Sequence, residues 1–189
     1  MTHSQTDELI RMTAKRLFAT FGYEGISMRI LAHESGVGLS SIYHFFKDKD
    51  VLLKEIYLET NRRLGQERQA LPQQPTAKQM LTQLIDFQFK HIEDVVYVLK
   101  YYLHFRREFA SLPTKTLPPK STLHIEEVID KGRLTGEFAI EPSDMAAQAK
   151  VVAHTINGYL LEYYPDVPRG TERQTMIDDI VSFTMRGLK

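Results

Sequence analysis

Residues 27–46, SMRILAHESGVGLSSIYHFF, decide the fold of this chain, because they describe two short helices joined by a glycine turn. Ser27 can cap the first helix, since its hydroxyl accepts free N–H groups of the first turn. Apolar residues at helical spacing then indicate a helix over residues 28–35. Gly36 permits the left-handed turn that ends it. A second helix is expected over residues 39–46, so the stretch predicts a helix-turn-helix.

The second helix of this pair has one apolar face and one polar face. Ile42, Phe45 and Phe46 share the apolar face and are expected in the core. The opposite face carries small and polar side chains, which suit the major groove of DNA because that groove admits one α-helix. Helix N-termini also bind phosphate. The expected DNA-binding residues are Ser27, Met28, Arg29, Gly38, Leu39, Ser40, Ser41, Tyr43, His44 and Lys49.

The rest of the chain shows helical spacing and no convincing strand. All eight prolines lie at or after Pro72, so proline-bounded segments follow a proline-free N-terminal part. Residues 112–119 are expected to form a loop. The predicted fold is all-α, with about nine helices: an N-terminal three-helix DNA-binding head and a C-terminal helical body. Besides the pair above, helices are expected over residues 6–21, 48–71, 76–93, 94–109, 120–131, 143–163 and 171–188.

Composition excludes several classes of protein. Hydrophobic residues make up 42% of the chain, enough to bury a core. The chain has no cysteine, which excludes disulfide scaffolds, cysteine-ligated metals and thiol nucleophiles. It has neither an apolar signal sequence nor an apolar run of 18 residues, so we expect a cytoplasmic protein without a membrane partner.

Motifs of catalysis and metal binding are absent from the sequence. There is no glycine-rich phosphate loop, no G-x-S-x-G and no H-E-x-x-H. His91, His104 and His154 match no metal-ligand spacing. The sequence therefore predicts neither an enzyme nor a cofactor.

The charge balance limits how the chain can bind DNA. Lys and Arg total 24, and Asp and Glu also total 24, so the formal net charge is zero. A broad basic field is not available, and any affinity for DNA must come from a few placed contacts. Arg29, Lys49, His44 and Lys47 are the candidate cations of the head.

The residues around the helix pair resemble one known family. Over residues 8–55 the chain closely resembles the tetracycline-repressor (TetR) family of bacterial transcriptional regulators. Residues 132–138, GRLTGEF, are similar to the glycine-bounded connection before the last two helices of that family. The residues that carry the N-terminal resemblance are 21–28 (FGYEGISM), Ala32, 35–37 (SGV) and 42–52 (IYHFFKDKDVL).

The resemblance implies an Ω-shaped homodimer whose subunits each have three parts. Residues 1–47 would be the DNA-binding domain, residues 48–71 the linking helix, and residues 72–189 the ligand-binding and dimerisation domain. In this family the unliganded protein usually occupies a pseudo-palindromic operator and represses transcription. Binding of a small ligand in the body moves the linking helix and changes the spacing of the two heads.

Two residues depart from the family pattern at the start of the groove-reading helix. Gly38 stands where a capping side chain such as serine is common, and it caps through its backbone only. Leu39 stands where a polar or basic residue is frequent. Leu39 either touches a thymine methyl group or packs on the first helix. These departures leave the operator sequence open.

The body supplies candidate contacts to an effector and to a second subunit. Aromatic residues gather in residues 87–109, which indicates either a core or a cavity for a largely apolar or aromatic effector. The candidate ligand contacts are His91, Tyr101, His104, Phe105 and Asn157. The candidate dimer contacts are Met145, Ala149, Val152, Ile156, Tyr159, Leu160, Tyr163, Ile177, Ile180, Val181 and Thr184.

Two other functions compete with a ligand-responsive repressor. A helical carrier or enzyme could keep a DNA-binding head that no longer binds DNA. A protein–protein adaptor could use the same head as a docking surface. Both are less consistent with the residues quoted above.

Overall fold

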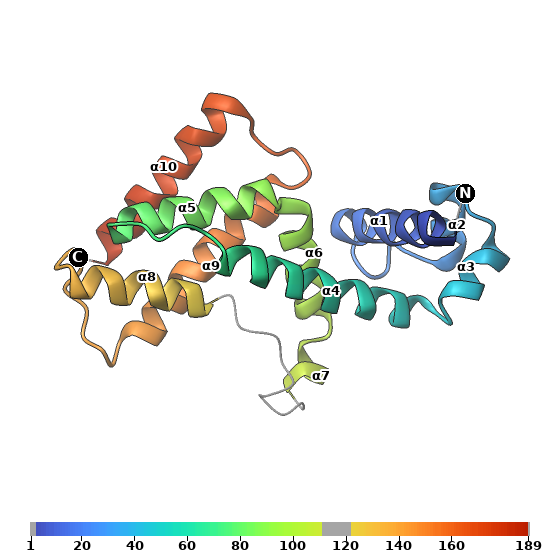
Figure 1. Cartoon of the computed structure of the whole chain (residues 1–189), viewed down its shortest axis with the longest axis horizontal. Helices are drawn as coiled ribbons and strands as arrows, with labels where there is room; N and C mark the ends of the chain where they lie inside the picture. The colour runs from blue at the N-terminus through green and yellow to red at the C-terminus, as the bar shows by residue number, and fades with distance from the viewer. Residues whose placement is uncertain (1–2, 111–121, 189) are drawn as a thin grey trace. The chain divides into compact units, whose positions relative to one another are not determined.

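A computed structural model describes residues 3–110 and 122–188, and these residues form ten helices and no strand (Figure 1). The predicted all-α fold is confirmed. The helix expected over residues 94–109 is two helices, separated at Phe105, whose ring packs against Tyr101. The helices are α1 His3–Phe21, α2 Met28–Ser35, α3 Leu39–Phe45, α4 Lys49–Gln69, α5 Ala77–Lys90, α6 Ile92–His104, α7 Arg106–Ala110, α8 Thr122–Leu134, α9 Met145–Tyr163 and α10 Gly170–Gly187.

The chain divides into two compact units. Unit 1 comprises Met1–Gly65 and Glu93–Pro118, and unit 2 comprises Gln66–Ile92 and Pro119–Lys189. Helix α4 begins in unit 1 and ends in unit 2. Unit 1 contains most of α6 and all of α7 as well as the helix-turn-helix, whereas the sequence grouped those two helices with the body. The functional boundaries at residues 47 and 71 stay a prediction.

The helix-turn-helix forms for the local reasons that the sequence indicates. Ser27 caps α2, because its Oγ accepts a hydrogen bond of 3.2 Å from the N–H of Ile30. Gly36 ends α2 with φ 67°, a left-handed conformation that favours glycine. Ile10, Leu31 and Ile42 are fully buried, one from each of the three helices, and they form the core of the head.

Helix α6 is fastened to α1 and α4 within unit 1. The buried hydroxyl of Tyr97 donates a hydrogen bond of 2.6 Å to the carbonyl oxygen of Leu53 in α4. The carboxylate of Asp94 pairs with Lys15 of α1 at 2.5 Å and with Arg63 of α4. These polar contacts link three helices that are distant in sequence.

Unit 2 is built from α5, α8, α9 and α10. Helix α8 packs against both α5 and α9, and α10 packs against α5. The Arg173 guanidinium of α10 donates a hydrogen bond of 2.6 Å to Asp86 of α5. The fully buried side chains of unit 2 include Leu81, Ile85, Ile129 and Ile156.

The segment 132–138 holds the start of α5 through Glu137. The Glu137 carboxylate accepts hydrogen bonds from the backbone N–H of Ala77 at 2.9 Å and of Lys78 at 3.3 Å. These are N–H groups of the first turn of a helix, which have no partner within the helix. The Ala77 N–H is the main reason that the pKa of Glu137 is lowered, and Thr135 adds a further hydrogen bond.

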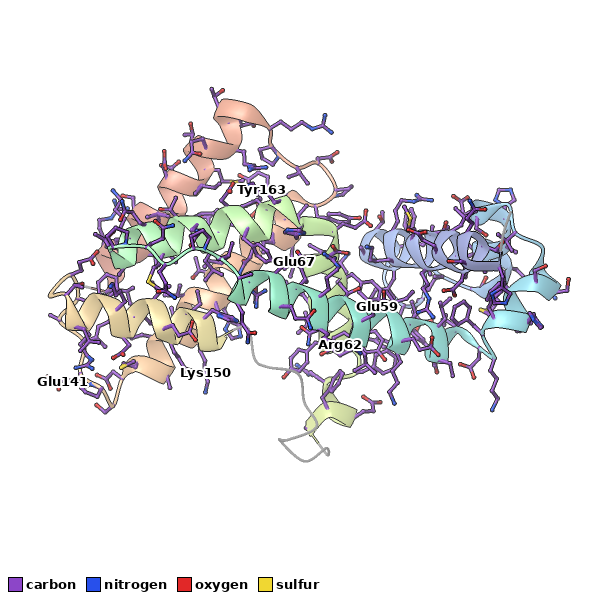
Figure 2. All side chains as sticks on the ribbon, in the orientation of Figure 1. Glu59, Arg62, Glu67, Glu141, Lys150 and Tyr163 are labelled. Carbon is purple, nitrogen blue, oxygen red and sulfur yellow. The ribbon has the colours of Figure 1, made fainter. Side chains whose placement is uncertain are left out.

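We expect Glu137→Ala to destabilise unit 2 by about 1 kcal/mol at pH 7, as for other lost helix caps. Because the folded pKa of Glu137 is depressed, its contribution is present above the unfolded pKa, about 4.3, and is lost as pH falls through the folded value. Urea denaturation of variant and wild type at pH 7 and pH 3 measures this. The matched control is Glu141→Ala, since Glu141 is an exposed carboxylate of the same connection (Figure 2). An equal loss in the control, or an unchanged difference at pH 3, would contradict the capping role.

Candidate nucleic-acid interface

The N-terminus of α3 is open to a ligand. Gly38 precedes it with φ −57° and ψ 140°, and no side chain caps the helix there. The first turn therefore presents backbone N–H groups to its surroundings. A Cβ atom at Gly38 would meet only Ser41 Oγ, at 3.8 Å, so the surface next to this turn is uncrowded.

The polar face of α3 is exposed and its apolar face is buried. Ser40, Ser41 and His44 are exposed, and the Tyr43 side chain is 52% exposed. Ile42 on the opposite face is fully buried. The exposed side chains thus lie on one face of a short helix, with small residues near its N-terminus and larger donors near its C-terminus.

Two residues of α3 are neither fully buried nor fully exposed. Phe45, expected in the core, is only half-buried, and the ring of His3 packs against it at a centroid distance of 4.3 Å. Leu39 is also half-buried. Both interpretations of Leu39, packing and contact with a thymine methyl group, therefore stay open.

The start of α2 contributes a cation and backbone donors. Arg29 is exposed, whereas the Met28 side chain is buried and only its backbone can reach a phosphate. The Ser27 hydroxyl already accepts from Ile30, so it caps the helix and retains its own O–H as a donor. The predicted trio thus consists of one side-chain cation, one backbone donor and one cap.

Lys49 fixes the turn in front of α2. Its Nζ donates hydrogen bonds to the carbonyl oxygens of Tyr23 at 3.0 Å and Ile26 at 3.1 Å, and it lies 3.6 Å from the centre of the Tyr23 ring. Two of its three N–H donors are used in this way, which leaves one for a phosphate. Lys49 therefore positions the start of α2, and a direct phosphate contact stays a prediction.

Tyr23 completes this turn and was missed as a positioning residue. Its hydroxyl donates a hydrogen bond of 2.5 Å to Asp50, and this bond is the main reason that its pKa rises to about 12. The ring also stacks on His104 at 4.2 Å. The sequence signal was its place between Gly22 and Gly25, which indicates a turn but not its partners.

Free positive charge on the head is sparse. Arg29 and Lys47 are exposed, and in residues 3–110 neither has a carboxylate partner within 4.0 Å. Arg16, by contrast, pairs with Glu34 at 3.4 Å. The head therefore presents few free cations beside a helix N-terminus, in agreement with the zero net charge of the chain.

Residues 10–56 match the sequence model of a family described as bacterial regulatory proteins, tetR family. The match spans α2, α3 and the turn fixed by Lys49, which is the geometry just described. This match places the N-terminal head in the TetR family. The matched residues therefore resemble the DNA-binding part of transcriptional regulators.

A curated relative agrees with this assignment. The chain is 29% identical over 89 residues to an uncharacterised HTH-type transcriptional regulator, YhgD, of Bacillus subtilis (strain 168). The match covers 44% of this chain and 47% of the relative, so the chain matches less than half of that relative's length.

Solved structures share the fold over nearly the whole chain. A TetR-family regulatory protein from Rhodococcus RHA1 has a TM-score of 0.67 at 19% identity and covers 97% of each chain. The ketosteroid transcriptional regulator KstR2 of Mycobacterium tuberculosis has a TM-score of 0.70 at 18% identity, covering 100% of this chain and 97% of its own. The fatty acid degradation regulator FadR from Bacillus halodurans has a TM-score of 0.68 at 14% identity, covering 100% and 99%.

The five predicted effector contacts do not gather in one unit. Tyr101, His104 and Phe105 lie in unit 1, where Tyr101 is buried and stacks on Tyr57 at 4.5 Å. His91 and Asn157 lie in unit 2, and His91 pairs with Glu67 at 3.4 Å. The aromatic residues of α6 thus pack within unit 1, and their role in binding an effector stays a prediction.

The predicted dimer contacts lie mostly in the interior of unit 2. Met145, Tyr159 and Tyr163 are half-buried. The other eight, buried within a single chain, are Ala149, Val152, Ile156, Leu160, Ile177, Ile180, Val181 and Thr184. The apolar stripe read from the sequence is therefore the face that packs within the subunit, and its part in dimerisation stays a prediction.

Two further features bear on partners. No helix of the described residues is long and apolar enough to cross a membrane. Within those same residues, no group of three or more His, Asp or Glu side chains is arranged to hold a metal ion.

The sequence did not indicate a cavity that lies in unit 2. This cavity has a volume of about 290 Å³, and Arg68 and His124 are among the residues that line it.

Proposed function

We propose that this TetR-family regulator is a cytoplasmic repressor that binds a pseudo-palindromic operator as a homodimer and is released by a small, largely apolar or aromatic effector. One observation carries the DNA-binding part: the uncapped N-terminus of α3 adjoins the exposed face of Ser40, Ser41, Tyr43 and His44. Such a helix can enter a major groove, with its N-terminal residues on base edges.

The contacts divide by their chemistry. Ser40 and Ser41 are small, so they allow α3 to approach the base edges closely. Tyr43 and Arg29 are exposed donors suited to phosphate oxygens, which fix register and orientation. The backbone N–H groups at the start of α2 and α3 add donors at positive helix ends.

Exposed apolar side chains on the last two long helices support the homodimer. The Val151 side chain of α9 is 62% exposed and the Phe183 side chain of α10 is 59% exposed. Burying a phenylalanine side chain is worth about 1.5–3 kcal/mol, so a second subunit covering these residues would be stabilised. These residues are proposed dimer contacts in addition to the predicted ones.

Phe183→Asp should convert a dimer into a monomer. Sedimentation equilibrium should give twice 21.9 kDa for the wild type and 21.9 kDa for the variant at the same micromolar concentration. Leu134→Asp is the control, because Leu134 is 68% exposed but lies on α8. A variant that keeps the wild-type mass would show that α10 does not form the interface.

Operator binding should depend only modestly on salt. Each neutralised phosphate contributes about −0.9 to the slope of log K against log salt, and the few free cations of two heads give roughly −4 to −7. Fluorescence anisotropy of labelled operator between 50 and 300 mM KCl measures the slope. A slope of about −10 or steeper would reveal a basic surface outside the proposed interface.

A mobility-shift assay with the DNA upstream of the regulator's own gene tests the proposed function. The wild-type protein should shift this duplex at low salt, and unlabelled nonspecific duplex should not compete efficiently. Absence of a shift at low salt would overturn the simple form of the proposal, in which the regulator controls its own promoter.

A further inference from the structure

The cavity of unit 2 is lined by apolar and amide side chains around one cation. Its volume is about 290 Å³, near the lower end for small-molecule sites. Apolar walls come from the segment that follows α4, from α5 and from α8. The lining residues are Arg68, Gln69, Leu71, Pro72, Gln73, Gln74, Met80, Gln83, Leu84, His124, Glu127 and Val128.

Arg68 is half-buried in this wall, and no described carboxylate forms an ion pair with it. Its Nε is inaccessible to solvent and makes no hydrogen bond to any described residue. Burial lowers the pKa of Arg68, and no carboxylate acts against that change. Its guanidinium lies 5.6 Å from the centre of the Phe87 ring, which offers a cation–π contact but no hydrogen-bond acceptor.

A guanidinium whose Nε is buried without a hydrogen bond is unfavourable for folding, so the cavity beside it is informative. Burying a charge is unfavourable unless it is paired and hydrogen-bonded. Arg68 is also out of place in the sequence pattern, because it continues the buried face of α4 formed by Tyr57 and Leu64. An apolar residue at this position would stabilise the folded state more than arginine does. The charge of Arg68 therefore indicates a role in binding.

The other charged groups of the cavity leave its positive charge to Arg68. His124 Nδ1 lies 3.3 Å from the Glu127 carboxylate, which can only accept, so Nδ1 carries the hydrogen. Burial is the main reason that the pKa of His124 is lowered, and Arg68 lowers it further, so His124 is neutral at pH 7. The Glu127 side chain is 66% exposed, so its negative charge is solvated. Of the lining residues, only Arg68 carries positive charge at pH 7.

We infer that this cavity binds a small monocarboxylate with an apolar body, whose carboxylate pairs with the Arg68 guanidinium while its apolar part packs against Met80, Leu84 and Val128. A carboxylate supplies the planar acceptor pair that a guanidinium matches, and a single negative charge balances the single cation. Inorganic anions would leave the apolar wall uncovered.

The position of Arg68 gives this ligand a route to the DNA-binding head. Arg68 is the penultimate residue of α4, a helix of 21 residues and about 30 Å. The first residue of the same helix is Lys49, which fixes the turn in front of α2. A ligand that holds the C-terminal end of α4 can therefore act on the residue that positions α2. The role as effector rests on the proposed function, whereas the binding itself does not.

Calorimetric titration of the full chain with butanoate, hexanoate, octanoate and benzoate, in the absence of DNA, tests the binding. At least one of these carboxylates should bind saturably, at one site per chain, and at least about tenfold more tightly than its neutral amide. Equal affinity for acid and amide, or no binding by any of the four up to 10 mM, would overturn the inference. Sodium sulfate is the control for an anion alone, and equal binding of sulfate would also overturn it.

The substitution Arg68→Met assigns the site. It should weaken carboxylate binding by at least about tenfold without lowering the melting temperature of the free protein, since it removes a half-buried charge whose Nε has no hydrogen-bond partner. Arg62→Met is the matched control, because Arg62 is an exposed arginine of the same helix (Figure 2), and it should bind like the wild type. Unchanged affinity in Arg68→Met would place the carboxylate elsewhere and overturn the assignment.

Operator binding measured without carboxylate keeps the two proposals apart. If the protein shifts its operator but binds none of the carboxylates, the inference fails and the proposed function stands. If a carboxylate binds through Arg68 but no genomic DNA is bound, the proposed function fails and the cavity assignment stands.

Discussion

Tyr43→Ala should weaken operator binding by at least about tenfold while the melting temperature of the protein stays unchanged. The Tyr43 side chain is 52% exposed and lies on the face of α3 opposite the core. A hydrogen bond to a charged phosphate contributes about 1.5–3 kcal/mol, so its loss corresponds to at least a tenfold change in affinity. Fluorescence anisotropy with labelled operator gives the affinity, and differential scanning calorimetry gives the stability.

Two further variants isolate the role of the Tyr43 hydroxyl. Tyr43→Phe keeps the ring and should lose most of the same affinity. Tyr102→Ala removes a tyrosine of similar exposure, 48%, from α6 and should leave operator binding intact. A large drop in melting temperature for Tyr43→Ala would show instead that Tyr43 supports the fold of the head.

Ile42→Ala should have the opposite pattern and destabilise unit 1 by about 2–5 kcal/mol. Ile42 is fully buried between the helices of the head, and its truncation leaves a cavity as well as removing apolar contacts. Urea denaturation followed by circular dichroism measures the free energy of unfolding. At temperatures where the variant is folded, its operator affinity should approach that of the wild type.

The adjacent pair of variants separates recognition from folding. Tyr43 and Ile42 are neighbours in α3, so their different effects depend only on the face of the helix that each occupies. A small loss of stability for Ile42→Ala, below about 1 kcal/mol, would contradict the described core of the head.

The sequence predicted the elements whose causes are local. Ser27 and Gly36 mark the ends of α2 by their own backbone preferences, and the spacing of Ile42 and Phe46 marks the buried face of α3. Such features depend on a few neighbouring residues, and the match to the TetR family rests on the same stretch.

Contacts between distant segments could not be predicted in this way. The pairing of Asp94 with Lys15, the bond from Tyr97 to Leu53, and the cap that Glu137 provides for α5 each join residues more than 40 positions apart. The first two of these contacts hold α6 in unit 1, whereas the sequence left both a core and a ligand cavity open for its aromatic residues. The fold supplied partners that residue spacing along one helix cannot show.

Amphipathic patterning in α9 and α10 does not identify the partner either. A stripe such as Ala149, Val152 and Ile156 shows that one face is covered, but not whether the same chain or another covers it. Arg68 is a single charged residue that follows apolar residues of α4 at helical spacing, and this pattern alone does not indicate a binding site. Its significance appears only when α5 and α8 close a cavity around it.

The central claim is tested most directly by selecting genomic fragments of the source organism with the purified protein and sequencing the fragments that bind. The wild-type protein should enrich fragments that share one pseudo-palindromic sequence, and a variant carrying Arg29→Ala and Tyr43→Ala, with unchanged melting temperature, should not enrich them. Enrichment of no common sequence, or equal enrichment by the folded double variant, would contradict recognition of DNA by the exposed face of α2 and α3.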